Sequence, residues 1–178
     1  RMRGHRHEAW AQYGLAQAFW RLNHLNRTKN RLIDARQLAE QFENNVLLAW
    51  ICLLEARLAR LDRNREGFRK KMVDAERLFR NLGNEPGRLA VRELELRDII
   101  DKDLSQSIWE EAVNLWEAVR RTGAWQHVVG TAITLSRLGV RRGNFIQISG
   151  ILDAAIGMAR ERGCREELWR LLRIRAQS

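Results

Sequence analysis

The sequence predicts an all-α protein, an α-solenoid of about four antiparallel helical hairpins followed by one C-terminal helix. The composition is dominated by Leu, Ala, Arg and Glu, which favour helices, and the chain has a single proline, Pro86. Gly83, Gly123 and Gly163 recur 40 residues apart, each after an arginine-rich stretch, as expected of residues that end helices. In the same 40-residue frame, apolar residues follow the spacing of one helix face.

The apolar residues before each glycine form columns that we expect to be buried in the second helix of every hairpin. Spacings of 4, 3, 3 and 4 residues separate the columns, which matches one face of an α-helix. The columns are Thr28/Phe68/Ile108/Ile148, Leu32/Met72/Ala112/Leu152, Ala35/Ala75/Leu115/Ala155, Leu38/Leu78/Ala118/Met158 and Ala39/Phe79/Val119/Ala159.

Short polar breaks separate the two helices of each hairpin. They are predicted at 26–30, 62–66, 101–103 and 141–144. The predicted helices cover 5–25, 30–43, 46–61, 65–82, 87–100, 104–122, 125–140, 145–162 and 165–176. The repeats then run over about 9–43, 46–83, 87–123 and 125–163, with a partial repeat at 165–176.

The chain is expected to be a single superhelical segment, 1–178, of a longer protein, because it opens on Arg1 and ends on a helix without its hairpin partner. The longest apolar run, 46–54, is too short to span a bilayer, so no membrane segment is predicted. Two cysteines and no signal-peptide pattern favour a reducing, cytoplasmic location.

The second helices have the small-large-small order of a tetratricopeptide repeat, clearest in Phe68, Met72, Ala75 and Gly83. The stretch 58–63 also resembles the inter-helix turn of that family. Over about 9–163 the chain resembles a long, 40-residue variant of the usual period of about 34 residues, as in MalT-type regulators and in the repeats that precede CHAT proteases. HEAT repeats have the same period, but their helix-kinking proline is missing here.

No catalytic or metal site is predicted. The sequence has no phosphate-binding glycine loop and no paired metal-binding histidines, and no nucleophile can be paired with a base. We therefore expect a protein that is not an enzyme and needs no cofactor.

Aromatic residues supply the first candidates for partner binding. Trp10 and Trp50 occupy the same column near the start of a first helix, and Tyr13 lies one turn after Trp10. In the tetratricopeptide family this part of the first helix faces the concave groove, so the resemblance implies aromatic anchors there. Packing between helices is the alternative, and it is the one favoured for most of the seven tryptophans.

Arginines supply the second set. Arg57, Arg97 and Arg137, with Gln17 in the first repeat, share one column midway along the first helices. If the family alignment holds, these side chains face the groove and suit carboxylates or phosphates along an extended acidic partner. A one-residue error in register turns the column to a solvated outer face instead.

The functional prediction is a non-catalytic interaction or sensor module of a regulatory protein that binds a protein or peptide segment in a helical groove. An acidic segment is one such partner. Nucleic-acid binding is the alternative, because the net charge is +10, although residues 84–123 carry 6 basic against 9 acidic residues and interrupt the basic surface. Self-association through the terminal helix is also open.

Overall fold

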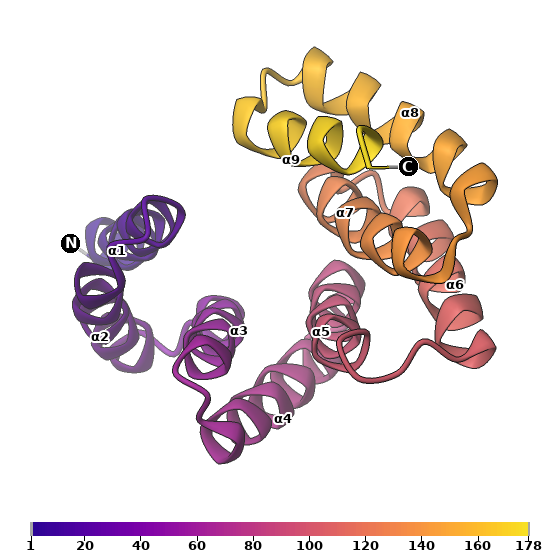
Figure 1. The fold of residues 1–178 in the computed structure, drawn as a ribbon. Coiled ribbons are helices and arrows are strands. Elements are labelled where there is room, and N and C mark those ends of the chain that lie inside the picture. Colours follow the sequence, from indigo (N-terminus) through magenta and orange to yellow (C-terminus); the bar gives the residue numbers. More distant parts are fainter. Residues whose placement is uncertain (1, 178) are drawn as a thin grey trace. The chain divides into compact units, whose positions relative to one another are not determined.

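The computed structural model describes residues 2–177, except for the side chains of residues 2–6, 125 and 126. All regular secondary structure in this part of the chain is α-helical, as predicted (Figure 1). The helices are α1 (Met2–Arg21), α2 (Leu25–Gln41), α3 (Asn45–Leu61), α4 (Arg65–Asn81), α5 (Glu85–Ile99), α6 (Gln106–Arg121), α7 (Trp125–Arg142), α8 (Phe145–Glu161) and α9 (Arg165–Arg175).

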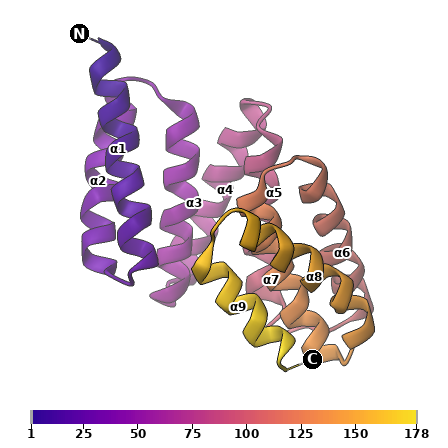
Figure 2. The same cartoon turned by 90° about the horizontal axis from the view of Figure 1, so that it is seen from above.

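The helices form two compact units, residues 1–91 and 92–178, and α5 contributes to both. In unit 1, α1 packs along α2 and α3 along α4, while α3 also contacts α2 and α1. Successive helices run antiparallel, which is clearest for α1 to α3 (Figure 2). Since α1 lies against α3, and no such contact joins α2 to α4 among the described residues, α1 and α3 form the inner layer of unit 1.

In unit 2, α7 is the central helix. It packs against α6, α8 and α9, and α8 also contacts α9. Sequential packing of this kind is solenoid-like, because each helix contacts its neighbours in the sequence. The continuation of the repeats as one superhelix over 1–178 stays a prediction.

A residue with a left-handed backbone ends nearly every helix, at intervals of 20 residues. In the described residues these are Asn23, Glu43, Arg63, Gly83, Gly123, Gly143 and Gly163. At all of these turns except the one at Gly123, the next amide donates to a carbonyl five residues back, as Asn84 N does to Phe79 O at 2.9 Å. At Gly123 the Ala124 amide donates to the Thr122 hydroxyl at 3.2 Å instead. The backbone hydrogen bond is the mark of a Schellman motif, so the predicted glycine positions are confirmed and belong to a finer, 20-residue period.

The residue after the left-handed position often begins the next helix. The Asn64 side chain accepts a hydrogen bond from Gly67 N at 2.8 Å, and Asn44 and Asn84 do the same for Leu47 N and Gly87 N. A three-residue turn therefore closes one helix and caps the next. These turns enclose α3 and α4, which have 17 residues each, as does α2 before them, so corresponding faces recur in register.

The predicted break at 26–30 is wrong. The chain turns at 22–24, and α2 already begins at Leu25. Asn23 takes the left-handed conformation, and the Thr28 hydroxyl donates to the His24 carbonyl at 3.1 Å inside the first turn of α2. The polar run that suggested a loop is thus the solvated beginning of a helix.

Three of the five predicted core columns are confirmed in full, and the other two are confirmed in part. All members of the Leu32, Ala35 and Ala39 columns are buried, whereas the Leu38 column is half-buried throughout. Thr28 and Ile148 are buried, while Phe68 and Ile108 in the same column are half-buried. Across the described residues, none of the helices has the length and apolar character needed to cross a membrane.

Replacement of Arg63 by glycine is expected to stabilise the fold. A side chain at φ = 56° is strained, and Gly83 takes the same turn position without that strain. We expect the free energy of unfolding of Arg63→Gly to rise by about 0.5–1 kcal/mol in urea titrations. Arg63→Ala is the matched control, since it removes the charge and keeps Cβ; an equal gain in both variants would contradict the strain.

Candidate functional site

Five of the seven predicted partner-binding residues lie together on the inner layer of unit 1. Trp10, Tyr13 and Gln17 are spaced at three and four residues along α1, and Trp50 and Arg57 lie on the adjacent α3. The Tyr13 hydroxyl lies 3.4 Å from the Trp50 carbonyl oxygen, to which it donates, and accepts a hydrogen bond from Gln17 Nε2 at 2.9 Å. This cluster couples α1 to α3.

Tyr13 is a core residue with only 6% of its surface exposed, so its ring has little area for a partner. Burial raises the pKa of Tyr13 to about 12, against the opposing effects of the nearby Arg57 charge and the Gln17 hydrogen bond. The role of Tyr13 in this structure is to support Trp10, whose ring meets it edge to face at a centroid distance of 6.0 Å.

Trp50 is also used mainly in packing. It is half-buried, and its ring meets Phe79 of α4 edge to face with centroids 4.8 Å apart. Phe79 in turn lies so close to Gly87 that a Cβ there would approach its ring to 2.2 Å. The contact therefore holds α3, α4 and the beginning of α5 together.

Trp10 is the exposed member of the cluster, with 40% of its surface accessible. It borders a hollow of about 450 Å³ in unit 1. The other lining residues, which the sequence did not single out, are His7, Glu43, Asn44, Asn45, Val46 and Leu82. Val46 and Leu82 are exposed apolar residues, so the hollow combines three apolar side chains with a polar rim.

The hollow is a product of the helix turns. Glu43 and Asn44 belong to the α2–α3 turn, Val46 to the first turn of α3, and Leu82 to the residue after α4, next to Gly83. The regular length of the helices brings these turns to the level of Trp10. Apolar residues placed within a polar turn, such as Leu82, are the sequence signal that was available for this site.

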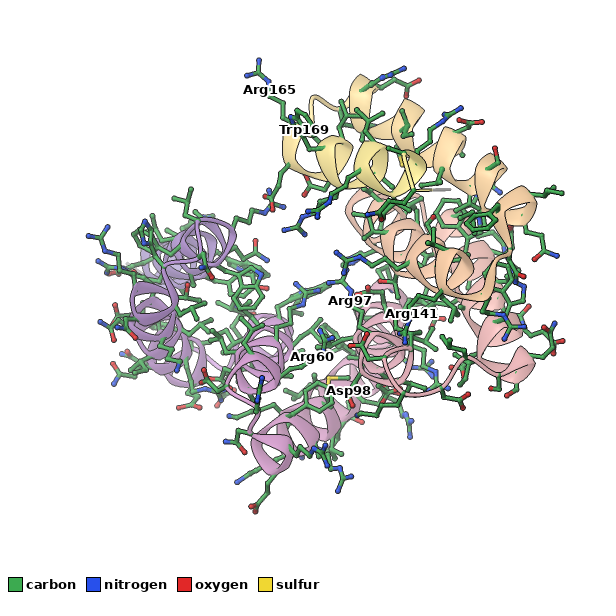
Figure 3. The ribbon with its side chains drawn as sticks, viewed as in Figure 1. Arg60, Arg97, Asp98, Arg141, Arg165 and Trp169 are labelled. Atoms are coloured by element: carbon green, nitrogen blue, oxygen red, sulfur yellow. The ribbon has the colours of Figure 1, made fainter. Side chains whose placement is uncertain are left out.

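The arginine column has mixed environments. Arg57 is half-buried beside Tyr13, whereas Arg137 on α7 is exposed. Arg97 is half-buried in unit 2, where its Nε donates to Thr134 Oγ1 at 3.0 Å and to the carboxylate of the buried Glu93 (Figure 3). Thr134 also donates to Glu93, at 2.6 Å. Arg97 thus joins α5 to α7, which is a structural role.

A second charged cluster links three helices of unit 1. Glu55 of α3 accepts two hydrogen bonds from Arg36 of α2, at 2.7 and 3.1 Å, and forms an ion pair with Lys71 of α4 at 2.7 Å. Arg36 also lies 3.5 Å from the sulfur of Cys52. Burial raises the pKa of the Cys52 thiol although Arg36 acts in the opposite direction.

Within the described residues, no group of three His, Cys, Asp or Glu side chains is placed to hold a metal ion. No family model matches the chain, and no curated protein matches it either. The resemblance to tetratricopeptide repeats therefore stays a prediction from the sequence.

Titration of Tyr13 tests the packing of the cluster directly, because Tyr13 is the single tyrosine of the chain. We expect its phenolate absorbance near 295 nm to appear with a midpoint of about 12 in the folded protein and at its ordinary value of 10.0 in denaturant. The folded state holds the proton more tightly. The contribution of this pKa difference to the free energy of unfolding is therefore fully present below pH 10, and it is lost as the pH rises towards 12.

The control is Tyr13→Phe, which should lose both the absorbance change and this alkaline loss of stability. A folded-state midpoint near 10 would show that the phenol is solvated and that α1 does not pack on α3 as described.

Proposed function

We propose that this chain is a non-catalytic interaction module that binds a protein or peptide segment at the inner layer of unit 1. The observation that supports this most directly is the exposed Trp10 at the rim of a hollow that also contains Val46 and Leu82. A rigidly supported tryptophan next to a depression that also holds apolar side chains is a common anchor for a partner, since it buries a large area at small entropic cost. The side chain of a bound peptide is the natural occupant.

The charge of this part of the chain favours an acidic segment. Residues 1–91 contain 18 Lys and Arg against 10 Asp and Glu, a net charge of +8, whereas residues 92–178 contain 14 against 12, a net charge of +2. Arg57 lies on the same layer as Trp10, beside Tyr13, and supplies a cation on that layer outside the lining of the hollow. The resemblance to tetratricopeptide proteins supports a docking or sensor role within a larger regulatory protein.

The experiment is a selection of displayed random peptides on the full chain, followed by affinity measurement by fluorescence polarisation. Trp10→Asp should weaken the selected peptides by about 30-fold, the effect of losing a central aromatic anchor. Val73→Asp is the matched control, because Val73 is an exposed apolar residue of α4 outside the hollow. Equal affinities for the wild type and Trp10→Asp would contradict the proposed site.

The arginine column is tested with neutral replacements, because a glutamate at position 97 would lie beside buried Glu93 and disturb the fold. Arg57→Gln should weaken acidic peptides several-fold and leave neutral peptides unchanged. Arg97→Gln should instead lower thermal stability, in keeping with its hydrogen bonds to α7. If the Arg97→Gln variant were fully stable but lost peptide binding, Arg97 would belong to the binding surface after all.

Nucleic-acid binding is the second candidate, and one observation favours it. Arg63, Arg65, Arg69 and Lys70 are exposed around the beginning of α4 and form no ion pair with other described residues. Such a cluster suits a phosphate backbone. If it binds single-stranded RNA, log Kd should rise steeply and linearly with log salt, and Arg65→Gln with Arg69→Gln should lower that slope by about 1–2. No retention of RNA at low salt would exclude this candidate.

A further inference from the structure

The hollow beside Trp10 differs in charge from unit 1 as a whole. Residues 1–91 contain 18 Lys and Arg against 10 Asp and Glu. Among the described residues that line the hollow, however, none is Lys or Arg, and the titratable ones are His7 and Glu43. The hollow is thus an acidic spot within a basic unit, and its occupant need not have the charge that the whole unit favours.

Glu43 supplies the carboxylate from a strained backbone position. It lies in the α2–α3 turn at φ = 48°, where a residue with a Cβ is disfavoured. The other described residues at this turn position are Asn, Arg or Gly, so Glu43 is the acidic exception. Glu43 is exposed, and its side chain forms no ion pair or hydrogen bond with another described residue. The turn therefore presents a carboxylate that nothing in the described part of the chain neutralises.

The two residues after Glu43 add hydrogen-bond acceptors to the rim. Asn44 Oδ1 accepts a hydrogen bond from Leu47 N at 3.1 Å, which leaves one of its two lone pairs for another donor. Asn45 is exposed, and its side chain forms no hydrogen bond with the rest of the described chain. Three consecutive residues thus bring a carboxylate and two amide oxygens to the lining of the hollow.

Apolar side chains complete the lining. Trp10, Val46 and Leu82 are 40%, 36% and 39% exposed, so each is partly covered by the protein and partly open. A tryptophan ring attracts a cation more strongly than other aromatic side chains do, and methylene groups of a long side chain pack on apolar surface. The lining therefore suits a side chain that is apolar along its stem and positively charged at its tip.

Charge and shape favour arginine over other side chains in this hollow. An apolar side chain would take water away from Glu43 without replacing it, and an acidic side chain would repel it. Lysine supplies its charge at a single point, whereas the planar guanidinium group of arginine stacks on an indole ring and has five N–H donors. These donors match the oxygens of Glu43, Asn44 and Asn45.

We propose that the hollow binds an arginine side chain of the partner segment, and that acidic residues flank this arginine. The guanidinium group pairs with Glu43 and stacks on Trp10, and the arginine stem covers Val46 and Leu82. The acidic neighbours meet the net positive charge of unit 1 outside the hollow. The inference rests on the proposed peptide site and assigns its central occupant.

The test uses the full chain and two fluorescein-labelled nine-residue peptides that differ only at the central residue. One has arginine there, and the other has citrulline, which has the shape of arginine without its charge. Two glutamates flank the centre on each side in both peptides. We expect the arginine peptide to bind about tenfold more tightly in fluorescence polarisation. The positive charge of unit 1 acts in the opposite direction, since it favours the more negative citrulline peptide, so this preference would come from the hollow.

Variants of the hollow locate the interaction. Glu43→Gln should weaken the arginine peptide by about tenfold and leave the citrulline peptide unchanged. Glu43→Gly should weaken the arginine peptide equally while raising thermal stability, because glycine relieves the left-handed strain. Trp10→Ala should also weaken it. Glu66→Gln is the matched control and should leave the affinity unchanged, since Glu66 is an exposed acidic residue of unit 1 outside the hollow.

Equal binding of the two peptides, absence of binding by both, or unchanged binding by Glu43→Gln would overturn this inference. The display selection distinguishes that failure from a failure of the proposed function. Selected peptides that depend on Trp10 but not on Glu43 would keep the peptide site and overturn only the assignment of arginine to it. Selected peptides that do not depend on Trp10 would overturn both.

Discussion

The repeated three-residue turn is the constraint on which the rest of the structure depends. A left-handed residue ends a helix, and the residue after it begins the next one, so most helices of this chain have nearly the same length. Equal lengths keep apolar faces in register from one helix to the next, which is why the columns at Leu32, Ala35 and Ala39 are buried throughout. Altered turns would change helix length and shift every contact that follows.

The position of the candidate site follows from this arrangement. Central helices such as α3 and α7 are buried on nearly all sides, so they have little surface left for a partner. Exposed aromatic residues occur instead on α1, where Trp10 stands beside the turns, and on α8 and α9, where Phe145 and Trp169 are exposed. Half-buried charged residues such as Glu55 and Arg97 connect the helices in between.

Much of the fold follows from local rules and was therefore accessible from the sequence. The spacing of Met72, Ala75 and Phe79 predicts one buried helix face, and glycine at position 83 predicts the end of that helix. The first turn was misplaced because Asn23, an ordinary polar residue, adopts a backbone conformation more typical of glycine.

The candidate site was only partly accessible. Trp10 was selected as a binding residue because it shares a column of the 40-residue frame with Trp50, and it is exposed beside the hollow. Val46 and Leu82 were missed because they are distant from Trp10 in the sequence and meet it only in the folded chain. Tyr13 was selected as a binding residue but is buried. The spacing of residues along the sequence does not by itself show which side of α1 packs on α3.

The most direct test of the binding role is photo-crosslinking from position 10 in a cell lysate, with benzoylphenylalanine in place of Trp10. We expect a discrete protein adduct at position 10 that persists after nuclease treatment and is absent when the probe replaces Val73. Adducts of nucleic acid alone, or equal labelling from both positions, would contradict it.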